Sequence, residues 1–92
     1  MSPIYHTTAF AAAGRSGTSR LEAGSLSLDL SVPGSGKPGT NPEQLFALGY
    51  AACFDNAVKL TARRLKLPLD CSETRANVAL VQDGGNFSLS VY

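Results

Sequence analysis

Residues 40–64, TNPEQLFALGYAACFDNAVKLTARR, form the longest patterned stretch of the sequence. Asn41 can cap a helix, Pro42 suits the first helical position, and Gln44 occupies the capping-box position. Apolar residues then recur at intervals of three and four until Pro68 ends the pattern. We therefore predict a single helix of more than twenty residues. Because its first half is apolar almost all round, we expect that half to be buried on most sides.

Strand patterns precede this helix. Residues 4–13 are rich in β-branched and aromatic side chains, and residues 20–32 alternate apolar and polar side chains from Ser25 onward. We predict a strand in each of these segments, the second with one buried face. Residues 33–40 are rich in glycine and proline and favour a loop within one domain over a linker between two domains.

Strand patterns also follow the helix. Residues 71–82 alternate and predict a strand, residues 83–86 predict a hairpin turn, and FSLSVY, residues 87–92, predicts the returning strand. The order β-β-helix-β-β predicts an α+β fold in which an antiparallel sheet packs on a long central helix. The length of 92 residues favours a single domain over residues 1–92.

The composition argues against several classes of function. A net charge of +1 without a basic stripe argues against nucleic acid as a partner. The first residues lack the features of a signal peptide and no apolar run reaches the length of a membrane span, so we expect a cytoplasmic protein without membrane contact. Two cysteines fit a reducing compartment. Their spacing, together with His6 as the single histidine, matches no zinc site, so we expect no metal and no other cofactor.

Cys53 lies in the middle of the predicted helix, and its residue type alone favours a packing role. Free cysteine usually behaves as a small buried hydrophobe. A reactive thiol needs a nearby cation or a helix N-terminus to stabilise its thiolate. Cys53 lies about three turns from the helix start, where the helix dipole has little effect. A stabilising cation must therefore come from elsewhere in the fold.

Four stretches of the sequence change this assessment. TNPEQLF followed by GY and ACF closely resembles the cysteine segment of the Ohr branch of the Ohr/OsmC superfamily, the organic hydroperoxide resistance proteins. AAAGRSG resembles the strand-end turn of that family, which carries an arginine, and SLSLDLSVPGSGKPGTNPEQ resembles its third strand and glycine-rich lead-in. NFSLSVY resembles a further strand of the family.

The resemblance implies a cysteine-based peroxidase that reduces organic or fatty-acid hydroperoxides to alcohols in defence against oxidative stress. Position by position, it implies that Cys53 attacks the peroxide, that Arg15 favours the thiolate and polarises the peroxide, and that Glu43 holds the arginine by a two-point contact. Aromatic residues of the helix would line an apolar passage for the substrate: Phe46, Tyr50 and Phe54. The resemblance also implies that an external thiol, carried by lipoylated proteins, reduces the oxidised enzyme.

Helix geometry bears on how such a site could be assembled. Glu43 and Cys53 are ten residues apart, which corresponds to about 15 Å along a straight helix. Either the helix breaks near Gly49, or a second copy of the chain brings the glutamate and the arginine to the thiol. The apolar surface around the helix favours the second copy, so we predict a homodimer. The resemblance likewise implies an OsmC-like, intertwined homodimer with sites at the subunit boundary.

The sequence also departs from the family pattern. Ohr proteins continue into a second long helix whose Cys-Pro-Tyr-Ser segment supplies a resolving cysteine, whereas this chain is C-terminally short and ends at Tyr92. We interpret Cys71 as a structural residue at the start of a strand and not as a substitute resolver. The sulfenic acid would then need an outside thiol or would over-oxidise. The alternative function is an Ohr-like dimer that cannot turn over and acts as a redox-sensitive binding or structural module.

Overall fold

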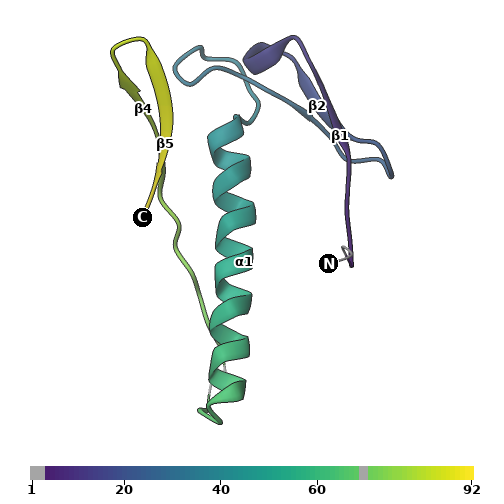
Figure 1. Ribbon diagram of the computed structural model, residues 1–92. Helices are drawn as coiled ribbons and strands as arrows, with labels where there is room; N and C mark the ends of the chain where they lie inside the picture. Colours follow the sequence, from purple (N-terminus) through teal and green to yellow (C-terminus); the bar gives the residue numbers. More distant parts are fainter. Residues whose placement is uncertain (1–3, 69–70) are drawn as a thin grey trace. The chain divides into compact units, whose positions relative to one another are not determined.

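The computed structural model describes residues 4–68 and 71–92 and has an α+β composition (Figure 1). Its elements in chain order are β1 (Ala9–Ala12), the 3-10 helix η1 (Gly14–Ser16), β2 (Thr18–Leu21), β3 (Ser27–Asp29), α1 (Pro42–Arg64), β4 (Val78–Asp83) and β5 (Asn86–Val91). The chain divides into two compact units, Met1–Pro42 and Glu43–Tyr92. The predicted α+β class is confirmed, but the described strands form two separate antiparallel sheets where we predicted one.

The first unit contains a three-stranded sheet in the order β1-β2-β3. A tight turn joins β1 to β2, in which Ala13 has a left-handed backbone with a φ of 63° and Gly17 donates its N–H to the carbonyl oxygen of Gly14 at 3.2 Å. A Cβ atom at Gly17 would lie 1.8 Å from the carbonyl oxygen of Ala12. Only glycine therefore fits at position 17, and this requirement fixes the backbone path of η1.

The prediction of one strand over residues 20–32 is wrong. β2 ends at Leu21 and β3 begins at Ser27, and a hairpin turn separates them. The N–H of Leu21 donates to the carbonyl oxygen of Leu26 at 3.0 Å, and Gly24 takes a φ of 88° within the turn. Of the alternating apolar residues, Leu28 is half-buried and Leu30 is buried, whereas Leu26 and Val32 are exposed. The alternation gives no sign of the turn that precedes it. The predicted strand over residues 4–13 likewise contracts to β1.

Residues 33–40 form a loop, as predicted, and both its ends are held within the first unit. The N–H of Ser31 donates to the carbonyl oxygen of Thr40 at 2.8 Å, and the N–H of Thr40 donates to that of Asp29 at 3.0 Å. Gly39 has a φ of 145°, and a Cβ there would lie 2.9 Å from the Asp29 oxygen. Leu30 and Ser31 are buried at this junction. The loop therefore closes on the strand it leaves, directly before α1 begins.

The second unit is built on α1, which confirms the predicted long helix. It runs for 23 residues from Pro42, where the sequence predicted its start, and Gly49 does not interrupt it. It ends in a Schellman motif, because the N–H of Leu67 donates to the carbonyl oxygen of Ala62 at 2.8 Å and the N–H of Lys66 donates to that of Arg63 at 3.1 Å. Lys66 takes the left-handed position with a φ of 56°.

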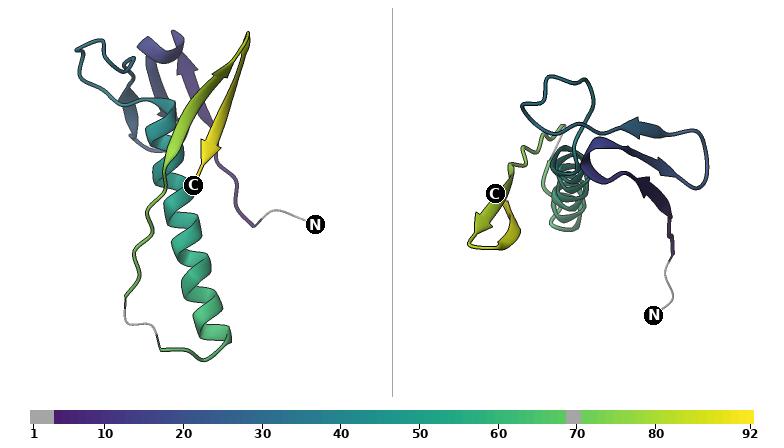
Figure 2. Two further views of the ribbon diagram at one scale, coloured as in Figure 1. Left: turned by 90° about the vertical axis from the view of Figure 1, so that its left-hand side faces the viewer. Right: turned by 90° about the horizontal axis from the view of Figure 1, so that it is seen from above.

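After the helix the chain returns beside α1 and forms the β4–β5 hairpin (Figures 1 and 2). The predicted turn is confirmed, since Asp83 pairs with Asn86 around two glycines. The strand predicted over residues 71–82 begins only at Val78. Among the described residues, none pairs as a strand with most of residues 71–77. Pairing starts where Asn77 and Tyr92 exchange backbone hydrogen bonds of 2.8 and 2.9 Å.

Few side chains are buried in the single chain. Among the described residues, Leu30 is the only hydrophobic side chain that is buried, and α1 contains none. The expectation that the first half of the helix is buried on most sides is therefore not met within one chain. Large apolar side chains within α1 are exposed from its first turns onward: Phe46, Leu48, Tyr50, Phe54, Val58 and Leu60. Within residues 4–68 and 71–92, no helix has the length and apolarity that crossing a membrane requires.

Candidate functional site

Cys53 lies at the centre of α1 and its thiol is free and exposed. Successive residues of a helix are rotated by about 100°, so residues three and four apart share one side. Cys53 follows Tyr50 by three residues and Phe46 by seven, which places the thiol on the same side of α1 as these two aromatic rings. The predicted nucleophile is therefore accessible and has apolar neighbours on its own helix.

An aromatic row runs along α1 beside this thiol. The ring centroids of Phe46 and Tyr50 lie 5.9 Å apart with planes inclined by 20°, and those of Tyr50 and Phe54 lie 6.5 Å apart at 17°. The three side chains are 43%, 44% and 52% exposed. Spacing of four residues along the helix brings these rings together. The structure thus places the three predicted lining residues in one continuous row.

Glu43 lies in the first turn of α1 and is half-buried. Because α1 is continuous through Gly49, the predicted alternative of a helix break is wrong. The ten-residue separation of Glu43 and Cys53 then corresponds to about 15 Å of helix rise. A carboxylate and a thiol so far apart cannot take part in one contact through this helix alone.

Arg15 is the central residue of η1, in the turn between β1 and β2, and its side chain is exposed. It belongs to the first unit, whereas Glu43 and Cys53 belong to the second. The predicted constellation is therefore divided between the two units of the chain. Each element of it is presented by a defined local structure: a glycine-constrained turn for the arginine and a regular helix for the other two residues.

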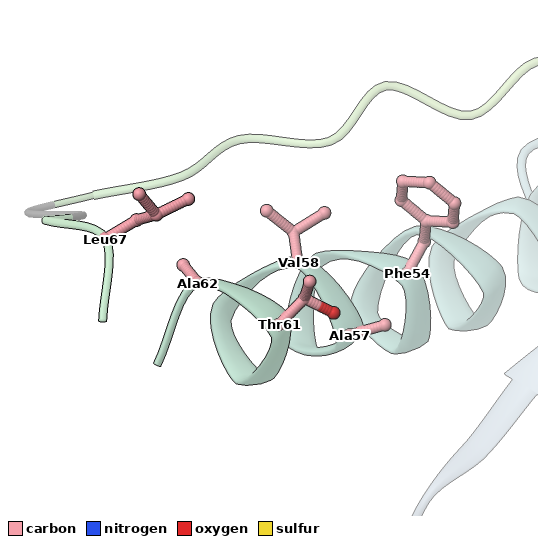
Figure 3. A pocket seen from close by; sticks show the side chains of 6 residues that line it. All are labelled: Phe54, Ala57, Val58, Thr61, Ala62 and Leu67. Carbon is pink, nitrogen blue, oxygen red and sulfur yellow. The ribbon is translucent and has the colours of Figure 1, made fainter. Parts of the chain in front are cut away.

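The second unit also contains an apolar hollow that the sequence did not predict (Figure 3). It is open, has a volume of about 450 Å³, and is lined by Phe54, Ala57, Val58, Thr61, Ala62 and Leu67. Phe54 and Val58 point to the same side of α1 (Figure 3). Leu67 closes one end because the Schellman motif turns it back toward the last turns of the helix. The Lys-Leu-Pro sequence after the helix was the only signal for this feature.

Asp55, two residues after Cys53 on α1, is half-buried and forms a long-range contact. Its Oδ1 accepts a hydrogen bond from Thr74 Oγ1 at 3.0 Å. Cys71, three residues before Thr74, is a free and exposed thiol. In the described part of the chain, no three metal-ligating side chains gather into a group that could hold an ion.

Comparison with known proteins gives consistent results. No family model matches the chain. The chain is 42% identical over 86 residues to organic hydroperoxide resistance protein OhrA of Bacillus subtilis, covering 88% of this chain and 60% of that protein. It is 43% identical over 94 residues to the organic hydroperoxide resistance protein of Xanthomonas axonopodis pv. citri, covering 96% and 66%. The chain thus spans about 60% of the length of the first of these relatives.

Solved structures agree in fold. A crystal structure of a putative organic hydroperoxide resistance protein from Vibrio cholerae, with captopril bound in one of its active sites, matches with a TM-score of 0.89 and 49% identity, covering 99% of this chain and 66% of that one. The crystal structure of OhrB of Bacillus subtilis matches with a TM-score of 0.86 and 37% identity, covering 97% and 69%. The OsmC-like arrangement of antiparallel sheets and one long helix is therefore shared with both proteins.

Proposed function

The chain belongs to the organic hydroperoxide resistance (Ohr) family, and we propose that it is a cysteine-based peroxidase that reduces organic hydroperoxides to alcohols. The observation that carries this proposal is the position of Cys53. It is a free, exposed thiol at the centre of α1, on the same side as an exposed aromatic row. No residue of α1 is buried in the single chain, so exposure alone does not separate a nucleophile from a packing residue. The place of Cys53 in the segment that resembles the family's cysteine segment favours the nucleophile.

The chemistry of the first step follows from this thiol. The thiolate of Cys53 attacks the terminal oxygen of the hydroperoxide, the O–O bond breaks, and the departing alkoxide takes up a proton to leave as the alcohol. The sulfur gains one oxygen and becomes a sulfenic acid. The hydroperoxide is reduced by two electrons and the thiol is oxidised by two, so the step needs no cofactor.

Arg15 and Glu43 would support this step. A guanidinium beside Cys53 favours the thiolate and stabilises the negative charge that develops on the departing oxygen. Glu43 can hold the planar guanidinium by two parallel hydrogen bonds, which aligns it for the reaction. Since α1 separates Glu43 from Cys53 by about 15 Å, the arginine and the glutamate of one copy serve the thiol of another. The functional form under this proposal is a homodimer.

The exposed apolar surface of α1 supports this assembly. A helix with no buried residue and with apolar side chains on several sides is not stable alone in water. A second copy would cover part of that surface and leave the remainder as a passage. Phe46, Tyr50 and Phe54 would then contact the hydrocarbon part of the substrate, since stacked aromatic rings beside the thiol form an apolar wall.

An external thiol would complete the cycle. The sulfenic acid of Cys53 condenses with that thiol, releases water and forms a mixed disulfide, and a second thiol then restores Cys53. A dithiol of the dihydrolipoyl type supplies both thiols in one molecule. This class of reductant is the one that the family resemblance implies.

Peroxide consumption by two matched variants tests the proposal. Reduced protein is given tert-butyl hydroperoxide with dithiothreitol, and the remaining peroxide is measured over time. Cys53→Ser is expected to abolish consumption, and Cys71→Ser, which removes the other exposed thiol, is expected to leave it unchanged. Consumption that persists in the Cys53→Ser protein would overturn the assignment of the nucleophile. One equivalent consumed without further turnover in the unchanged protein would instead favour the redox-sensitive, non-catalytic module.

A further inference from the structure

The contact between Asp55 and Thr74 fixes how the chain returns along α1. The two residues are 19 positions apart, and their hydrogen bond of 3.0 Å is part-buried. The views in Figures 1 and 2 both place the returning chain beside α1. Between the end of the helix and β4, Thr74 is therefore attached to the side of the helix that Asp55 occupies.

That side of the helix is opposite to the side of Cys53. Two residues of helix correspond to a rotation of about 200°, so the side chains of Cys53 and Asp55 point in nearly opposite directions. The half-buried positions Ala51, Asp55 and Ala62 mark the side covered by the returning chain, whereas Cys53 is exposed. Thr74 and the thiol of Cys53 are thus separated by the body of the helix.

Exposure alternates along the returning chain and gives a second, independent observation. Ser72, Thr74 and Ala76 are half-buried, and the intervening side chains from Cys71 to Arg75 are exposed. In an extended chain successive side chains point to opposite sides, and the bond from Thr74 identifies the half-buried side as the one that faces α1. The thiol of Cys71 therefore points away from the helix.

A disulfide between the two cysteines does not fit this arrangement. The Cα atoms of a disulfide lie about 4.4–6.8 Å apart. An α-helix with its side chains is about 10–12 Å across, and three residues of extended chain from Thr74 to Cys71 span a further ~10 Å. Bridging Cys53 and Cys71 within one chain would require Thr74 to leave Asp55.

We propose that Asp55 and Thr74 are positioning residues that keep Cys71 from resolving the oxidised Cys53 of the same chain. The inference rests on the proposed function for its role in the cycle. If the hydrogen bond between Thr74 and Asp55 were broken, the sulfenic acid on Cys53 would condense with the thiol of Cys71, releasing one water and forming an intrachain disulfide. With this hydrogen bond intact, the same sulfenic acid is out of reach of Cys71 and stays available to other thiols. The hydrogen bond thus keeps the thiol of Cys71 apart from the sulfenic acid of Cys53.

The experiment measures how readily the Cys53–Cys71 bridge forms in the absence of any peroxide. Reduced 92-residue protein is equilibrated in glutathione redox buffers, and the fraction of linked peptides gives the effective concentration of the two thiols. Glutathione exchange needs no peroxidatic chemistry, so this result stands whether or not the protein proves to be a peroxidase.

Thr74→Val removes the hydroxyl donor at nearly constant volume, and Thr74→Ser retains it. Loss of one hydrogen bond of ordinary net strength is expected to raise the effective concentration about fivefold in Thr74→Val. Thr74→Ser should match the unchanged protein, and Asp55→Ala, which breaks the bond from the other partner, should match Thr74→Val. In denaturing urea the effective concentration of the two thiols should be higher than in the folded state and equal in all four proteins.

Two results would overturn the inference. One is an unchanged protein that forms the bridge as readily as it does in urea. The other is a folded Thr74→Val or Asp55→Ala protein, verified by circular dichroism, whose bridge is no easier to form than that of Thr74→Ser. Either result would mean that the hydrogen bond does not control the distance between the thiols.

Discussion

Gly17 lies so close to Ala12 that a Cβ atom on the glycine would sit 1.8 Å from the alanine carbonyl oxygen. This approach forms the turn that presents Arg15 on η1. The requirement for glycine is therefore steric and concerns backbone atoms, which cannot move aside as a flexible side chain can. The turn that carries the predicted catalytic arginine depends on a residue that does no chemistry.

The first prediction concerns this turn. Gly17→Ala is expected to lower the free energy of unfolding by about 2–4 kcal/mol, because the backbone must shift to admit the methyl group. Gly85→Ala is the matched control: its Cβ would have no neighbour within 4 Å, so we expect a change within about 0.5 kcal/mol. Urea unfolding of both variants at equal protein concentration checks the difference. Equal stabilities would contradict the steric assignment.

A second prediction concerns the end of α1. Lys66 occupies the left-handed position of the Schellman motif, which costs a non-glycine residue roughly 1 kcal/mol or more. We expect Lys66→Gly to stabilise the protein by about 0.5–1 kcal/mol. Lys59→Gly, in the interior of the same helix, should instead destabilise it by about 1 kcal/mol. Thermal unfolding followed by circular dichroism shows which variant is stabilised and which is destabilised. A destabilising Lys66→Gly would be inconsistent with the observed motif.

The aromatic row leads to a third prediction, about substrate preference. Tyr50→Ala opens a gap between Phe46 and Phe54 and should weaken contacts with a long hydrocarbon chain. We expect kcat/KM to fall up to about tenfold for a long-chain alkyl hydroperoxide and much less for tert-butyl hydroperoxide. Leu48→Ala, which removes an exposed apolar side chain from another side of α1, should not change the ratio. If Tyr50→Ala leaves the ratio of kcat/KM for the long-chain hydroperoxide to kcat/KM for tert-butyl hydroperoxide unchanged, the aromatic row does not contact the substrate.

Mixed dimers give a fourth prediction, which tests whether two copies share each site. Cys53→Ser and Arg15→Ala are each expected to be inactive. If the arginine of one copy serves the thiol of the other, a heterodimer of these two variants contains one intact site. Random exchange of the two proteins should then restore about a quarter of the original activity, because half the dimers are mixed and each has one working site of two. No recovery in dimers verified by mass would place both residues of a site in one copy.

Local signals explain the parts of the fold that could be predicted from the sequence. α1 was predicted with its correct start because capping preferences and 3–4 spacing act within a few residues. The Gly84–Gly85 turn was predicted for the same reason. The β2–β3 turn was missed because the alternation that begins at Ser25 carries no information about the residues before it, and Gly24 alone was too weak a signal. Residues 71–77 were predicted as strand because alternation does not reveal whether a partner strand exists.

The candidate site depended on a different kind of information. Cys53, Arg15 and Glu43 were singled out through family resemblance, since no periodicity in the sequence connects a turn arginine with a mid-helix thiol. The continuity of α1 then excluded a helix break near Gly49, and the site shared between two copies stays a prediction. The hydrogen bond from Thr74 to Asp55 could not be predicted, because it joins residues 19 positions apart that share no motif.

The central claim is that Cys53 is the peroxidatic thiol, and peptide-resolved mass spectrometry tests it most directly. Reduced protein is treated with one equivalent of an organic hydroperoxide in the presence of dimedone, which traps sulfenic acid. We predict dimedone on the peptide that contains Cys53 and none on the peptide that contains Cys71. An unmodified Cys53 in protein that has been exposed to the peroxide would contradict the claim and make this cysteine a packing residue of α1.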